Sequence, residues 1–357
     1  MSNIIKYEKF IGTNFDEFYI KDIIGAGAMG VVFRAFDKDL GRDVALKVLK
    51  KECISDENKL LERFKIEAIN IAKLQHPNII NVFSIGFAHG LNYIVMEYVQ
   101  GEKLSDLLYN NEEFTIIDYL HIIYKVAKAL QYSHKNGVIH RDIKPANIMI
   151  SGDNKEVKVV DFGLSKTVYS HANSISKFGD LIGTPVYLAP ELWETSQNVS
   201  FKSDIYSLGV LMYECLTGKY PYEGKNNHEI YRSILLNNYK EAITLNPAIS
   251  VELNILINKM LKKDITIRAD IDFVIKYLEN AIEYYEHNII ENHKLSEIHT
   301  ENSKSDISTK STVLQIDNNR SSISLNLENS FKAKEKYFII GIIGIILSMV
   351  AVLIFFI

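Results

Sequence analysis

Cysteine and excess charge are both scarce in this sequence of 357 residues. The two cysteines, Cys53 and Cys215, lie far apart and outside any Cys-x-x-Cys or Cys/His cluster, which excludes a disulfide framework and a cysteine-ligated zinc site. The net charge of -4 argues against electrostatic binding of nucleic acid. The N-terminal residues MSNIIKYEKFIG lack the basic start and apolar core of a signal peptide. The reducing cytosol is therefore the default compartment.

Long apolar runs are absent except near the C-terminus. Residues 337–357, YFIIGIIGIILSMVAVLIFFI, carry no charge and as a helix would reach about 30 Å, the thickness of a bilayer core. A buried soluble helix is the alternative, but it would seldom run this long without a polar face. Lys332, Lys334 and Lys336 precede the run, so the positive-inside rule predicts a single-pass cell-membrane protein whose N-terminal part is cytoplasmic.

Small residues recur along this predicted membrane span. Gly341, Gly344, Ser348 and Ala351 would line one face of a helix. Such a face allows two helices to approach closely, although these residue types are common in membrane helices generally. A homodimer through the span is one expectation, and a homodimer through the preceding domain is the alternative.

Residues 139–165, IHRDIKPANIMISGDNKEVKVVDFGLS, place several catalytic residue types in one strand-loop-strand segment. Apolar runs at 148–150 and 157–160 predict the strands. Between and beside them lie Asp142, Lys144, Asn147 and Asp161. One carboxylate can orient a hydroxyl, a lysine can contact a transferring phosphate, and the remaining oxygens suit magnesium. This grouping indicates phosphoryl transfer.

A glycine-rich turn lies upstream, within Gly25-Ala-Gly27-Ala-Met-Gly30. Glycines there allow backbone amides to approach a polyphosphate without a Cβ in the way. A dinucleotide-binding fold uses the same spacing but opens a helix after the third glycine. Here residues 31–33, Val-Val-Phe, favour a second strand and hence a β-hairpin over the phosphates.

Lys47 lies among apolar residues in the next predicted strand, and a partly buried ammonium needs a partner. Residues 56–74 predict an amphipathic helix with Phe64, Ala68, Ile71 and Leu74 on one stripe. Glu67 falls on the same stripe, so a Lys47–Glu67 ion pair is the simplest interpretation. A solvated helix edge is the alternative for Glu67.

Together these motifs resemble the eukaryotic-type (Hanks-type) Ser/Thr protein kinases, including their bacterial transmembrane members. The resemblance covers residues 18–285 and implies an α+β, bilobal protein-kinase fold. The small β-rich N-lobe (18–99) would carry one helix, and the C-lobe (100–285) would be mainly helical. Residues 1–17 would be an N-terminal extension. Residues 286–336, rich in Ser, Asn, Lys and Thr, would form a largely disordered linker to the membrane helix at 337–357.

The resemblance also implies site roles. Asp142 would be the catalytic base and Lys144 the γ-phosphate contact, while Lys47, held by Glu67, would contact the α- and β-phosphates. Asn147 and Asp161 would bind Mg²⁺, with Mn²⁺ as the alternative. Thr184, in GTPVYLAPE, would bond the catalytic aspartate and mark Ser/Thr specificity. The residues implied at the ATP site are Ile24, Gly25, Ala26, Gly27, Ala28, Met29, Gly30, Val32, Ala45, Lys47, Met96, Glu97, Val99 and Met149.

Regulation is expected at the activation segment, residues 161–191. In kinases of this family, an arginine directly before the catalytic aspartate, as Arg141 is before Asp142, usually needs a phosphate group in this segment to neutralise its charge. Ser174 or Ser176 is the candidate phosphosite, since either lies at a suitable distance before Thr184.

The family's hydrophobic column is matched by His140, Phe162, Ile71 and Val82, with Asp204 at its base. Glu191 and Arg268 match the family's structural ion pair.

The predicted function is that of a membrane-anchored Ser/Thr protein kinase that uses ATP and magnesium to phosphorylate protein substrates, including its own activation loop. A pseudokinase scaffold is the first rival, and retention of Lys47, Asp142, Asn147 and Asp161 argues against it. A small-molecule kinase is the second rival, disfavoured because such proteins generally lack the APE-type segment present at 189–191.

Overall fold

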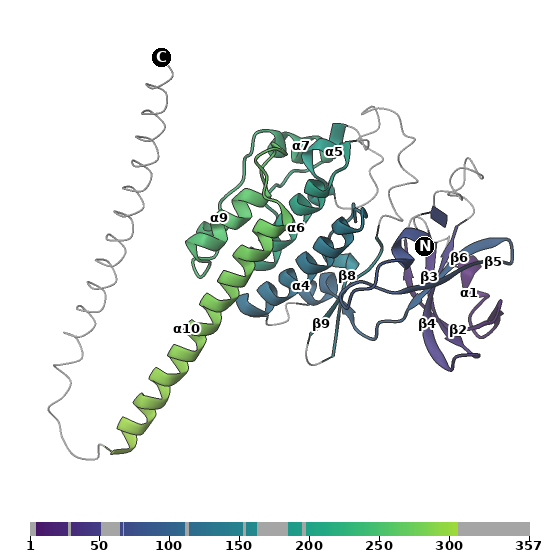
Figure 1. Cartoon of the computed structure of the whole chain (residues 1–357), viewed down its shortest axis with the longest axis horizontal. Helices are drawn as coiled ribbons and strands as arrows, with labels where there is room; N and C mark the ends of the chain where they lie inside the picture. The colour runs from purple at the N-terminus through teal and green to yellow at the C-terminus, as the bar shows by residue number, and fades with distance from the viewer. Residues whose placement is uncertain are drawn as a thin grey trace, which may run out of the picture. The chain divides into compact units, whose positions relative to one another are not determined.

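The computed structural model describes residues 5–27, 30–50, 65–66, 68–110, 114–152, 155–162, 185–194 and 198–305. Two compact units divide the chain, Met1–Asn288 and Ile289–Ile357. The first unit holds the candidate site, with strands gathered in one part and helices in another (Figure 1). Several predicted features lie outside the described residues: Ala28, Met29, Glu67, Ser174, Ser176, Thr184 and the span 337–357.

The N-lobe is built on a six-stranded antiparallel sheet of order β1-β2-β3-β4-β6-β5. Its strands are β1 (Asn14–Phe15), β2 (Phe18–Ala26), β3 (Gly30–Asp37), β4 (Arg42–Leu49), β5 (Val82–Ala88) and β6 (Leu91–Glu97). Side chains alternate between its faces. On β4, Val44, Leu46 and Val48 join one apolar cluster, whereas Ala45 belongs to the core that continues into the C-lobe. The alternation directs Lys47 to the same face as Ala45.

The hairpin predicted from the glycine-rich turn is present. β2 pairs with β3 through Ala26↔Val31 and Gly25↔Val32, so the third glycine opens a strand. Gly30 is needed for close packing, because a Cβ there would lie 2.6 Å from the carbonyl oxygen of Val48 on β4. The strand excludes the helix that a dinucleotide-binding turn would require.

Residues 5–17, which the sequence assigns to an N-terminal extension, pack against the N-lobe sheet. α1 (Ile5–Glu8) and β1 bring Tyr7, Phe10 and Phe15 into the sheet's second apolar cluster, with exposures of 2%, 7% and 0%. Phe15 packs edge-on against Phe10 and Tyr93. The Tyr93 hydroxyl donates to the Asp16 carboxylate at 2.6 Å. Three aromatic residues separated by polar ones carry no clear strand or helix period, which is why the pattern gave little signal.

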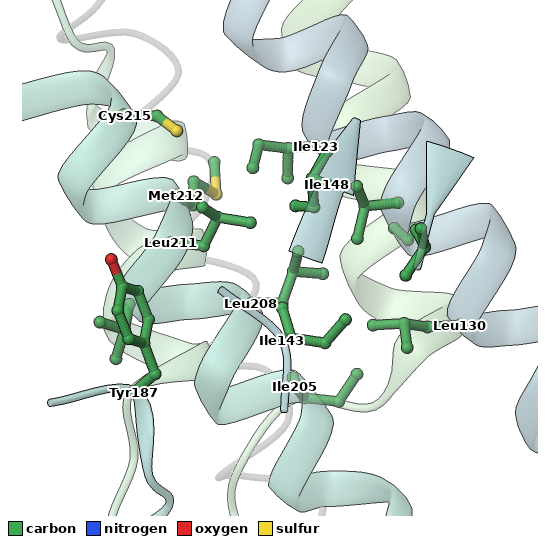
Figure 2. Packing of buried hydrophobic residues seen from close by; sticks show 14 of the residues in the cluster. Ile123, Leu130, Ile143, Ile148, Tyr187, Ile205, Leu208, Leu211, Met212 and Cys215 are labelled. Carbon is green, nitrogen blue, oxygen red and sulfur yellow. The ribbon is translucent and has the colours of Figure 1, made fainter. Parts of the chain in front are cut away.

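The C-lobe is organised around α4 (Ile116–Lys135) and α6 (Phe201–Thr217). α4 begins at Ile116, because Thr115 and Asp118 form a capping box in which each side chain accepts from the other residue's backbone N–H. α6 is buried along most of its length and ends at Gly218, whose φ of 68° is the left-handed conformation that terminates helices. Figure 2 shows how α6 packs against Ile123 and Leu130 of α4, and against Ile143 and Ile148 from the loop and strand that follow α4.

The remaining elements complete the lobe. A three-stranded sheet contains β7 (Glu102–Lys103), β8 (Ile148–Ser151) and β9 (Glu156–Val159), and both strands predicted for residues 139–165 are present in it. The other helices are α3 (Leu104–Tyr109), α5 (Pro190–Glu194), α7 (Asn227–Leu235), α8 (Ala242–Leu245), α9 (Val251–Met260) and α10 (Ile271–Ser305), with short 3-10 turns at Pro145–Asn147 and Pro185–Tyr187. Of the predicted helix 56–74, residues 65–66 and 68–72 are described as helical.

α10 differs from the expectation for the linker. The predicted boundary at residue 285 falls inside this helix, which continues to Ser305. No Gly or Pro interrupts residues 271–305, so nothing breaks the backbone hydrogen bonds. In the part of the chain that the structure describes, no helix combines the length and apolar character needed to cross a bilayer.

Candidate active site

The loop between α4 and β8 brings Asp142, Lys144 and Asn147 together. Ile143 is fully buried in the C-lobe core between α4 and α6, so its two polar neighbours are held at the surface of that core. The Asp142 Oδ2 atom accepts from Lys144 Nζ at 2.8 Å and from Asn147 Nδ2 at 3.0 Å. Asn147 Nδ2 also donates to the Asp142 carbonyl at 2.7 Å. One carboxylate is thereby fixed by two donors from its own loop.

Asp161 lies against the same loop. The backbone N–H of Val160 donates to the Asn147 carbonyl at 2.9 Å, which holds Asp161 beside Asn147. Lys47 of β4, 7% exposed, donates to Asp161 Oδ1 at 2.6 Å. Burial alone would raise the pKa of Asp161, but the Lys47 ammonium outweighs it and lowers that pKa below its ordinary value. Asp161 is therefore ionised, and it holds a φ of 60°, which only its bonded surroundings maintain.

These residues suit a hard divalent cation. Asn147 and Asp161 supply oxygen donors from adjoining backbone segments, and oxygen is the ligand type that magnesium prefers. Lys47 and Lys144 add two positive charges at the same place. The donor set thus fits a magnesium-bound polyphosphate.

The side chain of Asp204 on α6 fixes the backbone of the loop that carries Asp142. Its carboxylate is fully buried and accepts from the N–H groups of His140 and Arg141, each at 2.8 Å. His134 Nε2 lies 2.8 Å from Oδ2 of the same carboxylate. Arg141 has a φ of 70°, a costly conformation for a residue with a side chain, and the bond to Asp204 holds it there. Asp204 lies where the sequence placed it, whereas the role of His134 was missed.

His140 links the loop to Phe162, and their ring centroids lie 4.4 Å apart. Burial lowers the pKa of His140 below its ordinary value, so the ring is neutral at pH 7. Its Nδ1 atom accepts from the Asp142 N–H at 3.2 Å, and its Nε2 atom lies 3.0 Å from the Val160 carbonyl. These partners assign the proton to Nε2. The ring contact is the one predicted for the hydrophobic column.

The residues that the resemblance assigns to the nucleotide come from both lobes. Ala45 and Met96 face each other on β4 and β6 and are buried. Ile24 is 39% exposed near the end of β2. The half-buried members of the set are Gly25 on β2, Val32 on β3, Glu97 at the end of β6, Val99 in the following segment and Met149 on β8.

The segment joining the lobes is held by a polar network that the sequence did not reveal. Glu97 Oε2 accepts from Lys158 Nζ of β9 at 3.0 Å and from Asn81 Nδ2 at 2.8 Å. The Glu97 N–H donates to the Asn81 carbonyl at 2.9 Å. Lys158 precedes Asp161 on the same strand-to-loop segment, so the network connects the end of β6 with the segment that carries Asp161.

Comparison with known proteins gives the family. The protein kinase domain family matches residues 18–278. The chain belongs to the protein kinase family. The kinase is 43% identical to the serine/threonine-protein kinase PknB of Mycobacterium tuberculosis over 213 residues, which cover 58% of this chain and 34% of PknB. It is 38% identical over 252 residues to a probable serine/threonine-protein kinase of Clostridium acetobutylicum, covering 70% of this chain and 37% of that protein.

Solved structures support the same fold. The kinase superposes on Rad53 residues 1–466, solved with AMP-PNP, with a TM-score of 0.61 at 27% identity, covering 73% of this chain and 64% of that one. It superposes on a variant of the Mycobacterium tuberculosis PknI kinase domain with a TM-score of 0.59, covering 75% and 97% of the two chains. These likenesses confirm the bilobal fold. The curated relatives confirm the predicted resemblance to bacterial Ser/Thr kinases. The chain spans little more than a third of the length of the curated relatives named above.

The kinase also contains the structural ion pair expected from its sequence. Arg268, 2% exposed, donates from both terminal nitrogens to Glu191, each at 2.9 Å. Burial would raise the pKa of Glu191, but the Arg268 guanidinium lowers it overall. A bidentate pair of this kind fixes the end of the activation segment to the C-lobe. Of the predicted Lys47–Glu67 pair, the structure describes Lys47 alone, and Lys47 contacts Asp161.

Proposed function

We propose that this chain is a Ser/Thr protein kinase that transfers the γ-phosphate of ATP to hydroxyl groups of proteins. The observation that carries the proposal is the convergence of Asp142, Lys144 and Asn147 with Asp161 and Lys47, drawn from both lobes. The similarity to proteins named as serine/threonine kinases supports the choice of substrate hydroxyl.

The protein's part in this reaction is to position groups and to offset charge. Asp142, held by Lys144 and Asn147, orients the substrate hydroxyl and accepts its proton. Lys144 then lies beside the transferring phosphoryl group and offsets its charge. Lys47 holds the remaining phosphates and is itself kept in position by Asp161.

Asn147 and Asp161 are the residues that would hold Mg²⁺, which neutralises phosphate charge when it is bound. Asp161 is ionised well below neutral pH because of Lys47, so no proton must leave it before a cation binds. Mn²⁺ fits the same oxygen donors.

The test is incubation of the purified full-length chain with ATP, magnesium and a generic protein substrate. An Asp142→Asn variant serves as the control, and mass spectrometry locates each phosphorylated residue. Phosphate on serine and threonine in the wild type only is the expected result. Equal labelling of both proteins would overturn the catalytic assignment. Nucleotide binding without transfer by the wild type would favour a pseudokinase scaffold.

We further propose that the kinase phosphorylates its own activation segment at Ser174 or Ser176. The support is Arg141, a cation beside Asp142 that a phosphate in that segment would neutralise. Phosphopeptide mapping of active protein is expected to find one of these serines modified. Activity with both serines unmodified would refute the proposal.

The third part of the proposal is a membrane anchor at residues 337–357, with the kinase domain in the cytoplasm. The support is the uncharged run and the lysines before it. The full-length chain should sediment with membranes and resist alkaline extraction, whereas a chain ending at residue 336 should not. Equal sedimentation of the two would refute the anchor.

A homodimer through the span is tested with Gly344→Leu, which should lower crosslinking between chains.

A further inference from the structure

The described part of the chain contains two buried lysines, Lys47 and Lys50, and the proposed mechanism uses one of them. Lys50 follows β4 directly and is 9% exposed. A buried ammonium is costly unless it finds an acceptor. The acceptor here is the backbone carbonyl of Gly27, 2.5 Å from Lys50 Nζ.

Gly27 lies in the turn between β2 and β3 that the resemblance places over the phosphates. We call its described residues, 25–27 and 30, the glycine turn. Its two sides are joined by the bond from the Gly27 N–H to the Gly30 carbonyl, at 2.9 Å. Gly30 in turn is pressed against the Val48 carbonyl of β4, which leaves no room for a Cβ. The β3 side of the turn is therefore fixed by the sheet.

On the β2 side, Gly25 and Ala26 pair with Val32 and Val31 of β3, and Gly27 lies beyond this pairing. Around Gly27 an added Cβ would meet no atom within 4 Å, so packing does not restrain this residue. Gly27 is thus held by hydrogen bonds, to Gly30 across the turn and to Lys50, which lies outside the turn.

We propose that Lys50 is a positioning residue that holds the glycine turn in its nucleotide-binding conformation through the Gly27 carbonyl. A turn held before binding loses less conformational freedom when ATP arrives, so Lys50 increases affinity for ATP. Lys50 itself does not touch the reacting atoms. The expected effect of Lys50 on ATP affinity rests on the proposed kinase function, whereas its effect on the conformation of the glycine turn does not.

The test compares full-length wild type with Lys50→Met, which keeps the length of the side chain and removes the donor, and Lys50→Arg, which keeps a donor. Lys38→Met is the matched control, since Lys38 lies in the N-lobe at the far end of β3 and its Nζ contacts the side chain of Asn14. Hydrogen exchange of residues 25–32 is measured without nucleotide. The KM for ATP and kcat are measured on a peptide substrate.

In Lys50→Met we expect exchange of the glycine turn and the KM for ATP to rise about tenfold, with kcat within about threefold of wild type. Lys50→Arg should restore the KM to within about threefold, and Lys38→Met should match wild type. Unchanged exchange and KM in Lys50→Met would overturn the proposal, as would equal effects in Lys50→Arg or Lys38→Met. If the wild type transfers no phosphate, the proposed function fails, while the exchange data still decide the role of Lys50.

Discussion

Exchanging one carboxylate oxygen of Asp204 should release the catalytic loop from α6, which supports it. Replacing Asp204 by Asn keeps the size of the side chain and exchanges one oxygen for an NH₂ group. The carboxylate accepts from two backbone N–H groups, those of His140 and Arg141, through different oxygens. In the variant, the NH₂ group must therefore face one of these donors.

The cost follows from the contacts. A buried N–H left without an acceptor costs about 1–3 kcal/mol, and the remaining bonds change from charged to neutral acceptors, which weakens each of them. We expect Asp204→Asn to lower the free energy of unfolding by about 2–4 kcal/mol and Tm by about 5–15 °C. The NH₂ group should replace Oδ1, because Oδ2 also lies against His134. Arg141 then loses its bond and is released from its left-handed conformation, and Asp142 shifts with it. A displacement of about 1 Å at a catalytic group costs about 10²-fold in kcat.

The assay is urea unfolding together with steady-state kinetics well below the Tm of the variant. Glu252→Gln provides the control, because Glu252 is exposed on α9 and the change removes the same charge. The control should stay within about 0.5 kcal/mol of wild type. The reasoning is refuted if Asp204→Asn also stays within that limit and retains at least half of the wild-type kcat.

Three further changes test other parts of the structure. Phe15→Ala should destabilise the N-lobe by about 3–5 kcal/mol in urea unfolding, whereas Ile11→Ala, at a position 42% exposed, should cost under about 1 kcal/mol; equal costs would contradict the integral role of residues 5–17. Lys158→Met should raise the KM for ATP about threefold to tenfold by releasing Glu97, and an unchanged KM would contradict the network. Because burial lowers the pKa of His140 in the folded protein, the unfolded chain binds more protons below the ordinary histidine pKa of 6.5. The free energy of unfolding should therefore fall as the pH drops through about 6.5 toward the lower folded pKa, by at most about 1.4 kcal/mol per pH unit. A plot of Tm against pH should be flatter for His140→Phe than for wild type. Identical plots for the two proteins would contradict this.

Local patterns allowed the elements around the site to be predicted. The apolar runs of β8 and β9 and the strand after Gly30 each depend on neighbours a few residues apart, and each is present in the structure. The same reasoning gave no element within residues 5–17, because Tyr7, Phe10 and Phe15 are buried by strands distant in sequence rather than by a period of their own. It also gave no helix beyond residue 285, where α10 continues to Ser305, since a polar composition does not by itself stop a helix that lacks Gly and Pro.

The sequence by itself determined which chemical groups are available: Asp142, Lys144, Asn147 and Asp161 within one short segment, with Lys47 upstream. Tertiary structure alone decided which of them meet and what holds them. Lys47 contacts Asp161, Asp204 fixes the loop with His134, and Lys50 reaches Gly27. These contacts join residues 23 to 114 positions apart. No periodicity relates such positions, because their proximity is set by how β4 and α6 pack beside the loops.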